Sequence, residues 1–133
     1  MTLIQFFENN LRIKELHYYN DIFISMQRLT YDDQGKIIQW TNEDKNGEIY
    51  FTNTYYYVND LLIKETKISS DETVTITYNK NENIESYLII KTDKPSDEYK
   101  YEYTYDSNKN WTLIIEYKNG VPILYRERAI RYF

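Results

Sequence analysis

The chain of 133 residues has no cysteine, one histidine, three glycines and two prolines. Without cysteine it forms no disulfide and no thiolate metal site, and one histidine leaves carboxylates as the main candidate metal ligands. The three glycines are isolated, which excludes a glycine-rich phosphate loop. The first residues contain no basic stretch and no long apolar run, so they predict neither a signal peptide nor a membrane span. We therefore expect a cytoplasmic protein with no cofactor and no metal.

Basic residues are outnumbered, with 16 Lys and Arg against 21 Asp and Glu, for a formal net charge of −5. This balance disfavours nonspecific binding to nucleic acid and favours a basic protein as the partner. Because the chain has no long apolar run, we expect no membrane partner. Hydrophobic residues make up 41% of the chain and 16 residues are tyrosine, which is too much apolar material for a disordered protein. The length suits one folded domain over residues 1–133.

A degenerate segment recurs five times, and its leading aromatic residues are spaced about 25 positions apart. Each copy has an aromatic residue, a few turn-forming residues and then an apolar run, which is typical of a strand, a tight turn and a second strand. The copies begin at Phe6, Tyr31, Tyr56, Tyr78 and Tyr105. Further turn signals lie between them, at Asn20-Asp21, Asn46-Gly47, Ser70-Asp71, Pro95-Ser96 and Asn119-Gly120.

The repeats predict an all-β fold, an antiparallel up-and-down meander of about ten strands. Residues 2–9 are also compatible with a helix, but the match of Phe6-Phe7 to Tyr56-Tyr57 favours a strand. Because sheet twist accumulates over many strands, we expect a strongly rolled or barrel-like sheet. Tyrosines alternate with polar residues over Tyr99–Tyr105, which predicts one sheltered face. The apolar runs Leu88–Ile90 and Leu113–Ile115 predict strands covered on both faces.

The segment Tyr31-Asp32-x-x-Gly35-Lys36-Ile37 resembles the tyrosine-aspartate (YD, or RHS) repeat of bacterial toxin shells and cell-surface proteins. Tyr78-Asn79 and Tyr105-Asp106 are weaker matches. In that family each repeat is a β-hairpin of a long spiralling sheet, and the repeats act as a scaffold without catalytic residues. The resemblance therefore implies a β-hairpin array used for scaffolding or binding.

No arrangement of residues points to catalysis. A nucleophile triad would need His17, and no nucleophile-elbow sequence accompanies it, so we interpret His17 as structural. The pairs Asp32-Asp33, Glu43-Asp44, Asp71-Glu72 and Asp97-Glu98 lie in or beside predicted turns, where solvated charge is expected and the raised pKa that a catalytic acid needs is hard to arrange. The segment Asp106–Asn110 begins like a calcium loop, but it lacks the central glycine and the closing glutamate. We expect a protein that is not an enzyme.

Acidic residues gather at alternate turns, which share one end of an up-and-down sheet. The candidate partner-binding residues there are Glu43, Asp44, Glu48, Asp71, Glu72, Asp93, Asp97 and Glu98. A row of carboxylates would steer a basic protein toward this end of the sheet. By analogy of class, we expect a bacterial immunity protein that occludes a basic, nuclease-like toxin.

Three further interpretations stay open. A small β-barrel of about ten strands could carry an apolar ligand, and a YD-like unit could be a structural scaffold. An edge strand, such as the final one with Arg126, Arg128 and Arg131, is also available to pair with a second copy of the chain in a homodimer.

Overall fold

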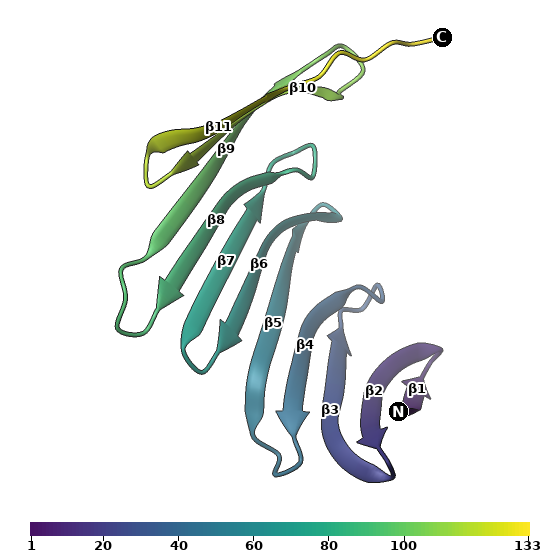
Figure 1. Ribbon diagram of the computed structural model, residues 1–133. Helices are drawn as coiled ribbons and strands as arrows, with labels where there is room; N and C mark the ends of the chain where they lie inside the picture. Colours follow the sequence, from purple (N-terminus) through teal and green to yellow (C-terminus); the bar gives the residue numbers. More distant parts are fainter. The chain divides into compact units, whose positions relative to one another are not determined.

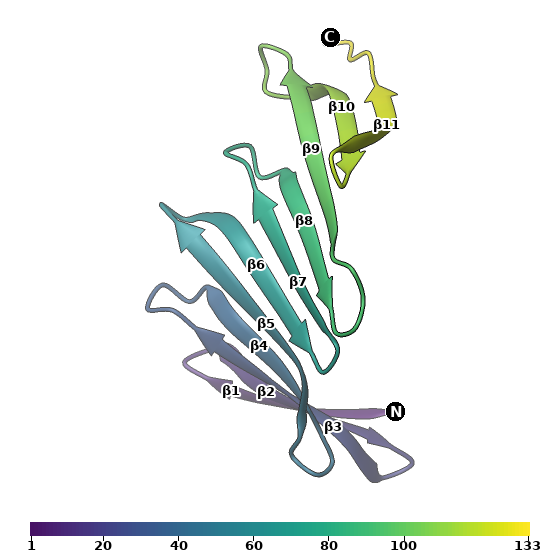
Figure 2. The same ribbon diagram turned by 90° about the vertical axis from the view of Figure 1, so that its left-hand side faces the viewer.

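The computed structural model describes all 133 residues, which form β-strands joined by short turns and an irregular segment at residues 128–133, without a helix (Figure 1, Figure 2). The strands are β1 (Thr2–Glu8), β2 (Leu11–Tyr19), β3 (Ile22–Tyr31), β4 (Ile37–Asp44), β5 (Ile49–Val58), β6 (Leu61–Ser69), β7 (Glu72–Tyr78), β8 (Ile84–Lys91), β9 (Asp97–Tyr105), β10 (Trp111–Lys118) and β11 (Val121–Glu127). No segment forms a helix that is long and apolar enough to span a membrane. The all-β expectation is confirmed, and residues 2–8 form a strand instead of a helix, with Asn9 in the turn that follows.

The strands lie in the sheet in the order in which they occur in the chain, from β1 to β11. Neighbouring strands such as β2 and β3, or β9 and β10, pair antiparallel. The up-and-down meander is therefore confirmed, with eleven strands where the repeats predicted about ten. The additional strand is β1, which leads into the first aromatic segment and so precedes the first full repeat. β1 and β11 stand at the two ends of the strand order.

Contacts within the chain define two compact units. Unit 1 comprises Met1–Tyr56 and Glu65–Asp71, which include β1 to β4, most of β5 and the end of β6. Unit 2 comprises Tyr57–Lys64 and Glu72–Phe133, which include the tip of the β5–β6 hairpin and β7 to β11. The sequence predicted one domain over residues 1–133, and its strands are distributed over these two units.

Two-residue turns close several hairpins, and both of their residues have positive φ. These turns are Asn9-Asn10, Asn20-Asp21, Asn59-Asp60 and Asn119-Gly120, with φ values from 48° to 80°. Positive φ at both central residues defines the type I′ turn, whose twist matches that of the flanking strands. Asn, Asp and Gly tolerate this left-handed conformation best, which explains their presence at these positions.

A second kind of turn is built on a side-chain oxygen. The first residue of this turn is Asp32, Asp44, Asn79 or Asp106. Its side-chain oxygen accepts hydrogen bonds from the backbone N–H groups two and four residues later, with N···O distances of 2.7–3.2 Å. The fourth residue of each turn has positive φ, and it is Gly35, Gly47, Glu82 or Lys109. The Tyr-Asp-x-x-Gly segment is therefore a turn motif, in which Asp organises the loop and Gly occupies the left-handed position.

Each unit is one layer of sheet, so side chains are shielded only by neighbours on the same face. Val74 is the one hydrophobic residue that is buried, at 4% exposed. In β9 the four tyrosines are partly buried while Lys100, Glu102 and Thr104 are exposed, which confirms the predicted alternation. The expectation that Leu88–Ile90 and Leu113–Ile115 are covered on both faces is wrong, because no second layer packs on them and Ile90 is 50% exposed.

Candidate functional site

Four of the predicted partner-binding residues belong to unit 1, at the β4–β5 and β6–β7 turns. The Glu43 carboxylate pairs with the Arg28 guanidinium at 2.6 Å across β3 and β4. Asp44 organises its own turn. Its carboxylate accepts hydrogen bonds from backbone N–H groups, and these lower the pKa of Asp44, with the bond from Glu48 N–H as the largest cause. The Asp71 carboxylate accepts hydrogen bonds from the hydroxyls of the two preceding serines, with O···O distances of 3.3 and 3.5 Å. Only the carboxylate of Glu48 makes no hydrogen bond or ion pair.

The other four belong to unit 2, at the start of β7 and around the β8–β9 turn. Glu72 pairs with Lys91 at 3.5 Å and Glu98 pairs with Lys100 at 3.3 Å. Asp97 pairs with Lys118 at 3.1 Å, and this hydrogen-bonded ion pair lowers the pKa of Asp97. Asp93, which has positive φ in its turn, has a side chain with no such contact.

Half of the eight predicted carboxylates are therefore ion-paired within the chain. Their partners lie on neighbouring strands or two residues away, so each unit neutralises part of its own acidic end. The open carboxylates are those of Glu48 in unit 1 and Asp93 in unit 2. The pairs of Glu72, Asp97 and Glu98 are exposed to solvent, and surface ion pairs contribute little to stability.

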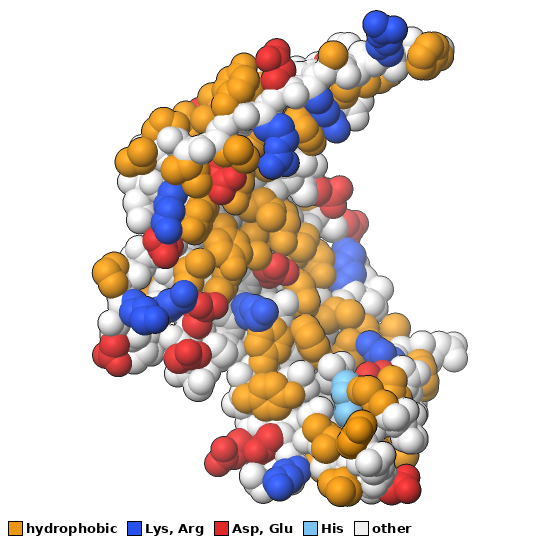
Figure 3. All heavy atoms as spheres, in the orientation of Figure 1, with side chains coloured by type: hydrophobic (Ala, Val, Ile, Leu, Met, Phe, Trp, Pro, Cys, Tyr) orange, Lys and Arg blue, Asp and Glu red, His pale blue; other side chains and the backbone are white.

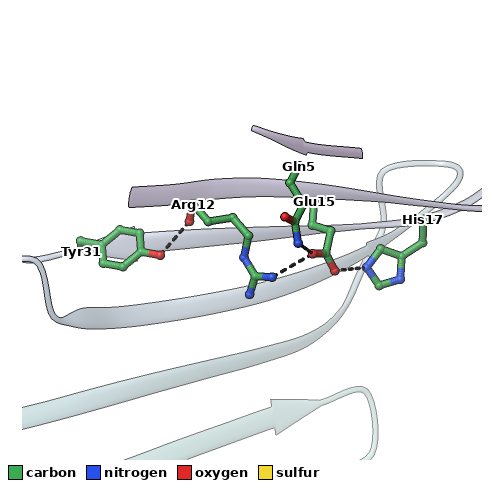
Figure 4. A network of polar contacts seen from close by, with 5 residues as sticks. All are labelled: Gln5, Arg12, Glu15, His17 and Tyr31. Carbon is green, nitrogen blue, oxygen red and sulfur yellow. Dashed lines mark hydrogen bonds and ion pairs between the residues drawn. The ribbon is translucent and has the colours of Figure 1, made fainter. Parts of the chain in front are cut away.

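A polar network that the sequence analysis did not identify lies on β1 and β2 of unit 1 (Figure 4). Its centre is Glu15, which is buried, with 6% of its surface exposed. The Glu15 carboxylate contacts His17 Nε2 at 2.8 Å and Arg12 Nη1 at 2.8 Å, and it accepts a hydrogen bond from the Gln5 side-chain amide. These contacts lower the pKa of Glu15, with the Gln5 hydrogen bond as the largest cause and burial opposing it.

A register shift in the sheet assembles this network. Phe6 pairs with Lys14 but Phe7 pairs with Arg12, so Ile13 is the extra residue of a β-bulge. In a regular strand, residues three apart point to opposite faces. The bulge places Arg12 on the face of Glu15, and the Tyr31 hydroxyl donates to the Arg12 carbonyl oxygen at 2.7 Å. Alternation alone assigned Arg12 to the opposite face, which is why the sequence pattern concealed the cluster.

Large apolar side chains lie at the surface of both units (Figure 3). In unit 1, all seven residues of β1 are exposed, including Leu3 at 49% and Phe7 at 60%. In unit 2, all seven residues of β11 are exposed, including Ile123 at 52% and Tyr125 at 63%. Large exposed apolar patches are often sites of interaction in other proteins.

The hairpins of unit 2 are joined through tyrosine hydroxyls. The Tyr105 hydroxyl accepts hydrogen bonds from the side-chain amides of Asn79 at 2.8 Å and Asn83 at 3.1 Å, both in the preceding turn. The Tyr132 hydroxyl makes the equivalent pair of contacts with the next turn, to Asp106 and to Asn110. The two sets have the same sequence separations of 26 and 22 residues, so the contact is a feature of the repeat.

The segment after β11 also returns to the sheet of unit 2. The Arg128 guanidinium lies 3.7 Å from the centre of the Trp111 ring, and its Nε donates to the Trp111 carbonyl oxygen at 2.6 Å. Arg128 and Arg131 follow β11, so of the three predicted arginines only Arg126 lies in the last strand. Arg128 thus anchors the chain end against β10.

No group of three or more His, Asp or Glu side chains is arranged to hold a metal ion. Asp106, the first residue of the calcium-loop candidate, uses its carboxylate to organise a hairpin turn and to bind the Tyr132 hydroxyl. No model of a known protein family matches the chain, and no curated protein matches it significantly.

Proposed function

We propose that this chain is a non-catalytic, protein-binding β-hairpin module that binds a basic partner stoichiometrically, in the manner of an immunity protein that occludes a toxin. The observation that carries the proposal is the exposed apolar surface of each unit, exemplified by Leu3 and Phe7 on β1 and Ile123 on β11. One layer of sheet cannot bury these side chains itself. A partner that covers them would stabilise the complex by about 25 cal/mol for each Å² of apolar surface removed from water.

The acidic turns supply the electrostatic part of the proposal. The open carboxylates of Glu48 and Asp93 attract a basic partner without first breaking an ion pair. The paired carboxylates, such as Glu98 with Lys100, are exposed and add to the negative field only in part. Such a field accelerates association and weakens as salt screens it.

A scaffold role of the YD-repeat kind is the second candidate, and the repeated tyrosine contact favours it. Tyr105 and Tyr132 bind successive turns in the same way, which is what a stackable hairpin repeat requires. The apolar-carrier interpretation has no such support, because a barrel needs its first and last strands to pair and β1 and β11 end the strand order.

If a gene beside that of this chain encodes a basic toxin domain, that domain is the partner to use in the test. Biolayer interferometry at about 0.05 M and about 0.3 M salt should show one-to-one binding whose association slows as salt rises. The double variant Glu48→Lys, Asp93→Lys should slow association further. A matched control, Asp33→Lys with Glu85→Lys, reverses the same number of acidic residues near the opposite ends of the strands.

Three outcomes separate the candidates. Inhibition of the toxin with the expected salt dependence supports the immunity role. Binding that is equally fast in both salts and in both double variants contradicts the electrostatic part. No binding, together with ordered self-assembly seen by light scattering, supports the scaffold role and contradicts the immunity role.

A further inference from the structure

β1 pairs with another strand along one edge only, because it is the first strand in the order of the sheet and its neighbour is β2. The backbone N–H and C=O groups of its other edge form a ready template for a further strand. Proteins usually protect such an edge with a proline, a β-bulge or charged side chains. The two outermost strands of this chain, β1 and β11, differ in that protection.

β11 carries all three kinds of protection. Pro122 lies within the strand and has no N–H to donate. Between Pro122 and Leu124 the pairing with β10 skips Ile123, so β11 itself contains a β-bulge. Arg126 and Glu127 add charge at its end. β11 is therefore poorly suited to pair with another strand.

β1 lacks this protection. It contains no proline, and its single charged residue, Glu8, is its last. The bulge between β1 and β2 lies at Ile13 of β2, so β1 itself stays regular. All seven residues of β1 are exposed. Its large apolar side chains are 41–60% exposed, and they are Leu3, Ile4, Phe6 and Phe7.

The turn after β1 determines which of its backbone groups are free. Asn9-Asn10 is a two-residue turn, so the flanking residues Glu8 and Leu11 exchange both of their backbone hydrogen bonds. In an antiparallel pair, residues that bond to the partner strand alternate with residues whose N–H and C=O point away from it. The β1 residues that point away from β2 are therefore Leu3, Gln5 and Phe7.

This spacing is self-complementary. When a second copy of β1 lies antiparallel with Gln5 opposite its own counterpart, Leu3 lies opposite Phe7 of the second copy, and Phe7 lies opposite Leu3. Each of these pairs exchanges two backbone hydrogen bonds, so every free group of the three residues is used. Within β1, a shift of this register by two residues leaves one of the three without a partner.

The side chains match on both faces in the same register. On one face Leu3 lies beside Phe7 of the second copy, and on the other face Ile4 lies beside Phe6 of the second copy. Cross-strand pairs of an aromatic and an aliphatic residue stabilise a sheet. Pairing would therefore cover the apolar side chains that one copy leaves in water.

The charges favour an antiparallel pair. Glu8 lies opposite Thr2 of the second copy, so the two Glu8 carboxylates stand at opposite ends, about 20 Å apart along the strands. Salt screens charges over about 10 Å, so their repulsion is weak. A parallel pair in register would bring the same carboxylates side by side.

We propose that β1 pairs antiparallel with β1 of a second copy, so that two chains form a twofold dimer. Because both copies use the same edge, the assembly closes at two chains and does not grow into a filament. The pairing strand is β1, and not the last strand with Arg126. The dimer is independent of the proposed binding of a basic partner, since the acidic turns and β11 take no part in it.

The experiment is sedimentation velocity of the intact chain over a wide range of concentration. We expect a reversible change from one chain to two, without larger species. Leu3→Lys places a charge opposite Phe7 of the second copy and occurs twice in each dimer, so it should weaken dimerisation at least about tenfold. Ile123→Lys is the matched control on β11, where the residue is 52% exposed against 49% for Leu3, and it should leave dimerisation unchanged. Circular dichroism checks that both variants are folded.

A second readout tests the register, and it uses a chain that has no cysteine of its own. Mixed Leu3→Cys and Phe7→Cys chains should form an intermolecular disulfide, because residues paired in this way have Cα atoms about 5.5 Å apart, within disulfide range. Either variant alone should cross-link more slowly, because its two cysteines are about 14 Å apart along the strands. A mixture of Leu3→Cys with Ile123→Cys is the matched control and should also be slow.

Four results would overturn the proposal. They are a single chain at every concentration, assemblies larger than two chains, equal weakening by Leu3→Lys and Ile123→Lys, and cross-linking of the mixed Leu3→Cys and Phe7→Cys chains that is no faster than in the controls. If Leu3→Lys does not fold, the cross-linking rates decide the outcome.

Discussion

The four turns organised by a side-chain oxygen predict where the chain can be stabilised. Their fourth residue is left-handed in every case, yet only Gly35 and Gly47 are glycine, while Glu82 and Lys109 have φ of 59° and 65°. A side chain in this conformation costs about 1–2 kcal/mol. Glycine removes that cost but gains about 0.5–1 kcal/mol of entropy in the unfolded chain. Glu82→Gly and Lys109→Gly should therefore each stabilise unit 2 by about 0.5–1 kcal/mol.

The measurement is urea denaturation followed by circular dichroism. The two turns share no hydrogen bond, so the double variant should approach the sum of the single changes. Lys80→Gly and Ser107→Gly are matched controls in the same two turns, at positions where φ is not positive, and they should destabilise the chain. If Glu82→Gly or Lys109→Gly lowers the urea midpoint as much as Lys80→Gly and Ser107→Gly do, backbone strain does not govern these turns.

Three further predictions concern side-chain contacts. Glu15→Gln should destabilise unit 1 by about 1–3 kcal/mol at pH 7, because the Arg12 guanidinium and the Gln5 amide lose a buried acceptor charge. Since folding lowers the Glu15 pKa, the difference should shrink as pH falls through that lowered pKa, which urea titrations at neutral and at acidic pH measure. Tyr105→Phe should cost about 1–2 kcal/mol through two lost hydrogen bonds, whereas the exposed Tyr125→Phe should cost nothing. Burial and neighbouring tyrosines raise the pKa of Tyr103 to about 12, so in an ultraviolet titration Tyr103 should ionise at higher pH than ordinary tyrosines. The free energy of unfolding should fall between pH 10 and 12, because in this range only the unfolded chain loses the Tyr103 proton.

Local patterns in the sequence predicted most of the fold. A strand needs period-two alternation and a hairpin needs Asn, Asp or Gly at fixed positions, and both signals involve residues close together in the chain. The tyrosine alternation of Tyr99–Tyr105 and the turn at Tyr31-Asp32 are clear examples, and the structure reproduces both. The prediction of buried strands at Leu88–Ile90 and Leu113–Ile115 failed because an apolar run shows what could be buried, while burial itself needs a second layer.

The candidate sites were less predictable for the same physical reason. The acidic residues such as Glu43 and Asp97 lie at the turns where their sequence positions placed them, but their ion pairs with Arg28 and Lys118 depend on strand register. Glu48 and Asp93 could not be distinguished in advance from the carboxylates that are paired.

The sequence by itself determined the strands, the turns and their order, because these depend on the conformational preferences of a few adjacent residues. Only the tertiary structure decided which side chains meet. One extra residue at Ile13 turned Arg12 toward Glu15, and cross-strand pairing placed Asn53 beside Trp40. A one-residue change of register reverses the face to which a side chain points. The contents of each face therefore depend on pairing between strands that sequence alternation alone does not specify.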